Sequence, residues 1–258
     1  MDRGLATGYG HLRDLVLHLA RNEVTVRNRW TLLGAAWPVI RQLAQLGVLV
    51  FVFSSVLDLG IENYAVYVFA GLIAWNWLST SVSEGTSSIV AARHLVFQPG
   101  FPTVALPVVA ATVALVDVLV ALPVLVVMLV VTGDLGWSFA LLPCLLAIQL
   151  VLTVGVVWIL SALTVYLRDV PHLITVGLTL LFYLTPVFYD LNRVPERYRD
   201  LLRLNPMTPL LEAYRAVLTD HPWPPVASLV AVGALSVALL ALGFALFRRL
   251  SPGFVDQL

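Results

Sequence analysis

The sequence predicts an all-α integral membrane protein, and three observations support this fold class. Hydrophobic residues make up 60% of the 258-residue chain, charged residues only 12%, and the mean hydropathy is +0.92. Soluble domains average about 25% charged residues. The apolar residues form long runs, and about 20 apolar residues suffice for one helix to cross a bilayer. These runs also lack the alternation of barrel strands, so helices must satisfy the backbone in lipid.

The chain length accommodates about six membrane-spanning helices and no large soluble domain. We therefore expect residues 1–258 to form a single transmembrane domain. Short polar or proline-containing turns separate the predicted spans, which are residues 33–57, 64–90, 103–132, 138–166, 172–189 and 225–247.

Two polar segments lie outside the predicted spans. Residues 11–29 place Leu12, Leu15 and Leu19 on one helical face, which predicts an amphipathic helix in the membrane interface or, alternatively, an ordinary packed helix. Residues 190–224 contain two amphipathic patterns split by NPMTP. They predict a pair of short re-entrant helices on the exterior side before the last span, with a simple surface loop as the alternative.

The distribution of arginine predicts the orientation. Every basic residue is arginine, and arginines occur in the N-terminal segment, after the second and fourth predicted spans, and in the C-terminal tail. With six spans all of these lie on one side, whereas the opposite turns DLGIEN and TGDLGW carry only acids. The positive-inside rule then places both termini in the cytoplasm. The arginines of residues 190–224 are the exception.

No pattern typical of an enzyme occurs in the sequence. It contains no G-x-S-x-G, no H-E-x-x-H and no Walker A phosphate loop. The histidines are scattered and Cys144 is the single cysteine, so no metal site is indicated. We expect no catalytic residue, metal or cofactor in this chain, and any energy for transport must come from a partner.

Polar residues within the predicted spans are candidates for function because they are costly in lipid. Asn76, Thr80, Ser83 and Ser87 share one helical stripe, which serves either helix packing or a path for a polar substrate. Asp117 lies within the third span, where it requires a neutral form or a bonded partner; a proton relay is the alternative.

Aromatic residues gather near the exterior ends of the second and fifth spans. They form either an interfacial belt or inward-facing surfaces that stack on sugar rings. The candidates for lining a channel are Tyr64, Tyr67, Phe69, Tyr183 and Tyr189.

Seven fragments, in order along nearly the whole chain, carry a resemblance to a known family. They are RNRWTLLGAAWPVIR, VFAGLIAWNWLS, ARHLVFQPGFPTVALP, SALTVYLRDVPHL, YLTPVFYD, LNPMTPLLEAYR and FRRLSPGFVDQL. Together they resemble the permease subunits of ABC-type exporters of polysaccharide, O antigen and teichoic acid. The stretch RHLVFQPGFP departs from the family, which usually has a more basic loop here, with a pattern like KKVxFPR.

The resemblance implies a bacterial cytoplasmic-membrane exporter of a lipid-linked glycan. Its partners are a second copy of the chain, two ATPase subunits that bind ATP and Mg, the polyprenyl-linked glycan and membrane lipid, with no nucleic acid. The resemblance also implies a coupling helix within residues 91–100 that docks on the ATPase. The implied contacts are Arg93, His94, Leu95, Val96 and Phe97.

The resemblance also implies roles for arginines near the cytoplasmic surface. Arg27, Arg29 and Arg41 are expected to attract the lipid diphosphate, although ordinary positive-inside anchoring explains them equally. Arg168 and Asp169 occupy the hairpin between the fourth and fifth spans, where Asp169 caps the next helix or pairs with Arg168. A second ATPase contact is the further possibility for this pair.

Three other functions are alternatives to a glycan exporter. The first is an ABC exporter of a drug or lipid, because apolar helices do not reveal the substrate. The second is an integral-membrane enzyme acting on polyprenyl phosphate, which requires clustered acids or histidines. The third is an ion-coupled carrier that uses Asp117.

Overall fold

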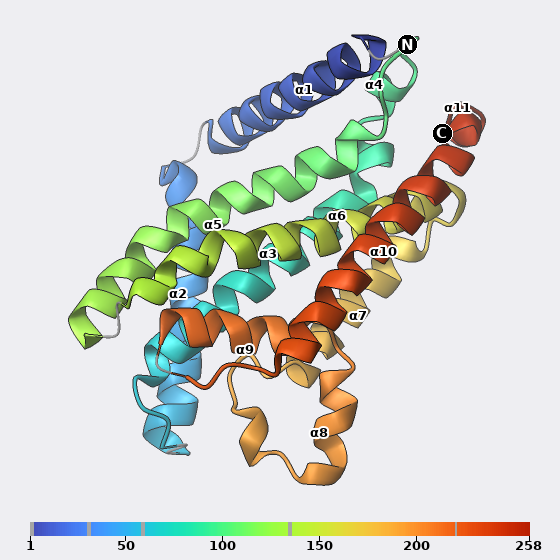
Figure 1. Cartoon of the computed structure of the whole chain (residues 1–258). Helices are drawn as coiled ribbons and strands as arrows, with labels where there is room; N and C mark the ends of the chain where they lie inside the picture. Colours follow the sequence, from blue (N-terminus) through green and yellow to red (C-terminus); the bar gives the residue numbers. More distant parts are fainter. Residues whose placement is uncertain (1–2, 30–31, 58–59, 134–135, 220) are drawn as a thin grey trace.

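The computed structural model describes residues 3–29, 32–57, 60–133, 136–219 and 221–258, and within these ranges it contains helices and no strand (Figure 1). The long helices follow the predicted spans closely. Their bounds are Trp37–Val50 for α2, Tyr64–Ala91 for α3, Ala105–Thr132 for α5, Leu142–Tyr166 for α6 and Val226–Leu250 for α10. A π-helical stretch, Phe51–Val56, extends α2.

The remaining helices lie outside these five. They are α1 (Arg3–Asn28), α4 (Arg93–Val96), α7 (Val170–Leu184), α8 (Glu196–Arg203), α9 (Met207–Leu218) and α11 (Phe254–Gln257). Short 3-10 turns precede α2, α6, α8 and α11. The start of α1, α4 and the C-terminal helix α11 lie at one end of the bundle, here called the α4 end, whereas α8 lies at the opposite end, the α8 end (Figure 1).

Five helical segments of the described chain are long and apolar enough to cross a membrane: 37–56, 64–91, 105–132, 138–166 and 226–257. They confirm five of the predicted spans by length and composition. The most buried of them is α3, where Val68, Phe69 and Leu72 are fully enclosed. By contrast, α7 and α10 expose most of their apolar side chains, including Leu173 and Val237. Such surfaces require lipid or another apolar partner.

The fifth predicted span, 172–189, is only partly helical. Its helix α7 ends at Leu184 after 15 residues, which gives a length of about 22 Å. Thr185 is extended because the following Pro186 disfavours the helical conformation in the residue before it. The helix therefore ends before the predicted boundary at residue 189.

Residues 170–189 nevertheless run the length of the bundle. Pro171 lines a cavity together with Ser87 at the α4 end, whereas the backbone carbonyl of Tyr189 accepts a 3.0 Å hydrogen bond from the Tyr67 hydroxyl near the other end of α3. The segment therefore lies antiparallel to α3 over most of its length.

The N-terminal helix packs on α5. Ala20 is buried against Val109 and Val113, and Val16 and Leu19 contact the same cluster. The apolar face predicted for residues 11–29 is therefore partly occupied by α5. Leu17 and Val26 remain exposed on other sides of α1.

Glycines allow α6 and α10 to approach closely. A Cβ on Gly155 would lie 2.6 Å from backbone atoms of Leu239 and Leu240, and one on Gly243 would collide with the carbonyl oxygen of Gly155. Small residues at helix contacts serve this purpose in membrane proteins.

We expect Gly155→Val to destabilise the protein by about 2–3 kcal/mol, because the added side chain must push two helix backbones apart. The apparent melting temperature of the purified full-length chain in detergent measures this effect. Gly177→Val is the matched control, since no atom lies within 4 Å of the Cβ position of Gly177 on α7. Equal melting temperatures for both variants would contradict the prediction.

Candidate functional site

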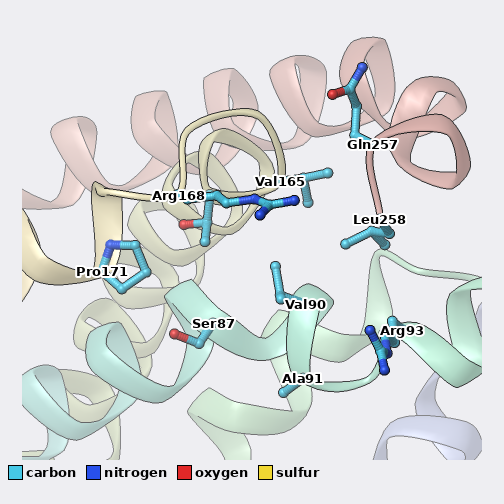
Figure 2. Close-up of a pocket in the computed structure, with 10 residues that line it drawn as sticks. Ser87, Val90, Ala91, Arg93, Val165, Arg168, Pro171, Gln257 and Leu258 are labelled. Atoms are coloured by element: carbon cyan, nitrogen blue, oxygen red, sulfur yellow. The ribbon is translucent and has the colours of Figure 1, made fainter.

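A cavity of about 540 Å³ lies at the α4 end (Figure 2). Its wall joins the end of α3, the start of α4, the α6–α7 hairpin and the last residues of the chain. Arg93 and Arg168 both line it, and Figure 2 shows them reaching it from different helix junctions, with Leu258 nearby. The fold thus brings together two arginines that the sequence separates widely and that were both predicted to contact the ATPase.

A small apolar cluster holds α4 in place. Val96 is buried against a group that includes Ile89, Phe247 and the fully buried Phe254. Because Phe254 belongs to α11, the C-terminal tail contributes to the support of α4. Within residues 91–100, where a coupling helix was predicted, the structure has one helical turn, α4. Its inner side packs on core residues through Val96.

The outward side of α4 is open. Arg93, His94 and Phe97 are exposed, Leu95 is half-buried, and Phe97 is 50% exposed. An exposed aromatic residue close to an exposed arginine is a composition that protein interfaces favour.

The hairpin residues Arg168 and Asp169 are also exposed at this end. Asp169 occupies the N-cap position of α7, but its side chain makes no capping hydrogen bond. Of the two roles predicted for Asp169, the side-chain cap is therefore wrong, and no ion pair between Asp169 and Arg168 occurs among the described residues. The backbone carbonyl of Asp169 still accepts a hydrogen bond from the Leu173 amide at 3.1 Å.

A second cavity, of about 430 Å³, lies among α1, α2, α3 and α5, and we call it the α2–α3 cavity. Its lining is strongly polar for a membrane protein. The polar residues that line it are Arg27, Arg41, Gln42, Gln45, Asn76, Ser79, Thr80, Glu84 and Asp117. An adjoining cavity of about 540 Å³ shares Arg27 and Glu84 with it and extends to His94 and Leu95 of α4.

Arg27 and Asp117 form an ion pair that links α1 to α5. This pair supplies the bonded partner predicted for Asp117. It also engages Arg27, which was predicted to contact the lipid diphosphate. Arg41 is exposed at the α2–α3 cavity. Arg29 closes the end of α1, where its amide donates to the Val26 carbonyl at 3.2 Å.

The residues of the polar stripe on α3 are divided between two cavities. Asn76 and Thr80 line the α2–α3 cavity, and the Asn76 side-chain amide donates to the Gln45 side-chain oxygen at 3.5 Å. Ser87 lines the cavity at the α4 end, whereas Ser83 is exposed. Three of the four polar residues therefore face cavities rather than close helix contacts.

The α8 end is organised around Arg215 of α9. This guanidinium is fully buried, donates at 2.7 Å to the carbonyl oxygens of Pro186 and Val187, and lies 3.6 Å above the ring of Tyr67. Gly71 leaves room for this contact, because a Cβ there would lie 2.9 Å from the Val187 oxygen and 3.2 Å from the guanidinium. In the sequence, Arg215 was only one of the exceptional arginines of residues 190–224. Its position in an apolar stretch after NPMTP was the signal that could have indicated burial.

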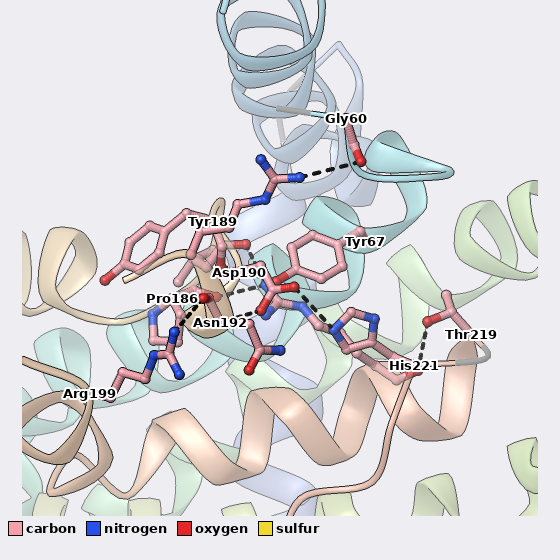
Figure 3. Close-up of polar contacts among 12 residues, drawn as sticks. Gly60, Tyr67, Pro186, Tyr189, Asp190, Asn192, Arg199, Thr219 and His221 are labelled. Atoms are coloured by element: carbon pink, nitrogen blue, oxygen red, sulfur yellow. Dashed lines mark hydrogen bonds and ion pairs between the residues drawn. The ribbon is translucent and has the colours of Figure 1, made fainter. Parts of the chain in front are cut away.

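His221 and Asp190 lie beside this arginine (Figure 3). Their side chains are 4.0 Å apart, and the His221 ring meets Tyr67 edge-on at 5.3 Å. Burial lowers the pKa of His221 below its ordinary value, although the Asp190 carboxylate opposes this shift. His221 is therefore neutral at neutral pH and packs as an aromatic ring.

The aromatic channel candidates fall into two groups. Tyr64, Tyr67 and Phe69 are buried inside the chain, and the Tyr64 hydroxyl donates to the Phe188 carbonyl at 2.7 Å. Tyr183 on α7 is 62% exposed, and Tyr189 is half-buried with its hydroxyl 3.3 Å from the Tyr183 carbonyl. Of these candidates, the second group alone presents aromatic surface to the outside of the chain.

Comparison with known proteins identifies the family of this chain. The chain matches the ABC-2 type transporter family over residues 14–219. It is 33% identical over 249 residues to the O-antigen export system permease protein RfbA of Myxococcus xanthus, covering 95% of this chain and 96% of that protein. An RfbA permease of Klebsiella pneumoniae is 27% identical over 254 residues, with 96% of each chain covered. An all-helical membrane protein that matches this family across most of its length belongs to it: the chain is a member of the ABC-2 type transporter family.

Proposed function

We propose that this chain is the permease subunit of an ATP-driven ABC exporter that moves a lipid-linked polysaccharide, such as O antigen, out of the cytoplasm. The single observation that carries the proposal is the 33% identity to an O-antigen permease over 95% of this chain. The absence of a nucleotide-binding loop from the sequence agrees with it, because a separate subunit must then bind ATP and Mg.

In the proposed topology the α4 end faces the cytoplasm. Residues 170–189 form the remaining crossing, the fifth along the chain, in which the short helix α7 is completed by the residues between Leu184 and Asp190. Six crossings place both termini on one side, which agrees with the location of the start of α1 and of α11 at the α4 end (Figure 1). In this arrangement α1 lies along the cytoplasmic interface, and α8 and α9 form the re-entrant pair on the exterior side.

The proposed complex contains two copies of the chain and two ATPase subunits. The export path runs between the copies, and the exposed face of α7 supplies part of its wall. Among the aromatic candidates, Tyr183 is the one best placed to contact sugar rings there, because its ring is exposed and the others are more enclosed.

The proposed ATPase contact is the exposed side of α4 together with the α6–α7 hairpin. Arg93, His94 and Phe97 supply the direct contacts, and Arg168 and Asp169 extend the surface. Val96 acts from behind, because it fastens the turn to the core so that force applied to α4 reaches α3 and α10.

The proposed diphosphate contact lies where α1 meets α2. Arg41 is exposed at the cavity and has a guanidinium suited to phosphate oxygens. Arg27 contacts the phosphate only when its ion pair with Asp117 opens. Arg29, at the end of α1, completes the basic group.

Co-purification tests the proposed function. The full-length chain, expressed with the ATPase encoded beside it, is expected to form a stable complex of two permease and two ATPase subunits that hydrolyses ATP. Mass measurement of the detergent-solubilised complex gives the stoichiometry. Isolation of the chain without any ATPase, under conditions where both are produced, would contradict the proposal.

A further inference from the structure

The α2–α3 cavity contains a buried acceptor that lacks a donor. Gln42 is 5% exposed, lines the cavity, and its side-chain oxygen receives no hydrogen bond from any group in the described part of the chain. A buried carbonyl oxygen left unpaired is costly, about 1–3 kcal/mol. A ligand that fits this position must therefore offer a hydroxyl or an amide N–H.

The charges around the cavity are balanced. Arg27 and Arg41 contribute two cations, and Glu84 and Asp117 contribute two carboxylates. Arg27 already pairs with Asp117, so little positive charge is left in excess. An ionised phosphate offers no hydrogen-bond donor and would be repelled by the carboxylates, so it matches the interior of this cavity poorly.

A neutral polyol matches it well. The wall presents amides from Gln45 and Asn76 and hydroxyls from Ser79 and Thr80, groups that both donate and accept. Trp37, at the rim, is 49% exposed and offers an apolar ring face. The volume of about 430 Å³ falls in the range of small-molecule pockets, about 300–1,000 Å³.

We infer that the α2–α3 cavity binds a sugar residue of the lipid-linked glycan, with Gln42 accepting a hydrogen bond from a sugar hydroxyl or N-acetyl N–H. The inference rests on the proposed function. We assign the site to the sugar attached directly to the lipid diphosphate, because Arg41, the proposed diphosphate contact, is exposed and lines the same cavity. The cavity thereby recognises the first sugar of the glycan.

The test compares two lipid probes: a polyprenyl diphosphate and the same lipid carrying one N-acetylhexosamine. The full-length chain, complexed with its ATPase in lipid nanodiscs, is expected to bind the sugar-bearing probe about ten-fold more tightly. In Gln42→Leu, which keeps the side-chain size and removes the acceptor, the affinity ratio of the two probes is expected to fall to about one.

Gln149→Leu is the matched control. Gln149 is fully buried on α6 outside the cavity, and its side-chain amide donates to the Ala74 carbonyl at 2.7 Å. This variant is expected to lower the melting temperature and to retain the affinity ratio. Gln42→Leu is expected to retain the melting temperature and to lose the affinity ratio, since the Gln42 oxygen has no partner to lose within the described residues.

The outcomes separate the two proposals. A ratio of about one in the wild type means that the cavity holds only water, which overturns the sugar site while leaving the exporter in place. An unchanged ratio in Gln42→Leu also overturns it. Binding of neither probe contradicts the sugar site and the exporter of lipid-linked glycans together.

Discussion

Replacing Arg215 with methionine is expected to destabilise the protein by about 3–5 kcal/mol, as a lower apparent melting temperature in detergent. The guanidinium donates to two carbonyl oxygens, of Pro186 and Val187, and no backbone amide in the described part of the chain donates to either of them. Methionine retains much of the volume but removes the cation above the Tyr67 ring and leaves both oxygens without this donor. The loss therefore reports these polar contacts rather than a cavity.

Two further variants define this effect. Arg215→Lys is expected to fall between the wild type and Arg215→Met, because a single ammonium does not reproduce the planar fork of arginine. Arg197→Met is the matched control: Arg197 lies 4.6 Å from the ring of Tyr198 but is exposed, so its loss should cost about 1 kcal/mol at most. A loss in Arg215→Met as small as in Arg197→Met would contradict the assigned role.

Reversing the charge of α4 is expected to uncouple ATP hydrolysis from export. The double variant Arg93→Glu with Phe97→Asp removes a basic side chain and an exposed aromatic ring from the proposed contact surface. Interface anchors of this kind contribute about 2 kcal/mol or more each, so export should fall by at least about ten-fold while the ATPase itself remains active. Surface glycan is measured in cells, and ATP hydrolysis is measured in the purified complex.

The matched control is Arg249→Glu with Val255→Asp. It makes the same change of charge and polarity at two exposed residues of the C-terminal segment, and neither side chain belongs to the apolar cluster that supports α4. Export in this control should remain near the wild-type level. Full export in the α4 variant, or equal loss in both, would remove the coupling role from α4.

Helix positions were well predicted because they depend on local hydropathy. The predicted span 64–90 appears as Tyr64–Ala91, and the predicted span 103–132 as Ala105–Thr132. The two short patterns in 190–224 appear as α8 and α9, divided at Asn205 and Pro206. The re-entrant position of these helices remains a prediction.

Side-chain roles were predicted less well, since they depend on contacts between distant segments. Asp117 required a partner in the third span, but nothing in the sequence indicated Arg27, which lies 90 positions away. Tyr64 and Tyr67 had the composition of an interfacial belt, yet the fold uses their hydroxyls to hold the residues after α7. Whether an aromatic residue faces lipid, channel or core depends on the rotation of its helix.

What the amino-acid sequence determined by itself was the helical membrane class, the helix boundaries and the resemblance to glycan exporters, because long apolar runs leave the backbone no other way to satisfy its hydrogen bonds in lipid. The tertiary structure alone decided which polar groups meet. It buried Arg215 against two carbonyls, paired Arg27 with Asp117, and left the Gln42 oxygen facing a polar cavity without a partner in the described chain. Hydropathy is a local property of the chain, whereas hydrogen-bond partners are assigned only when helices pack.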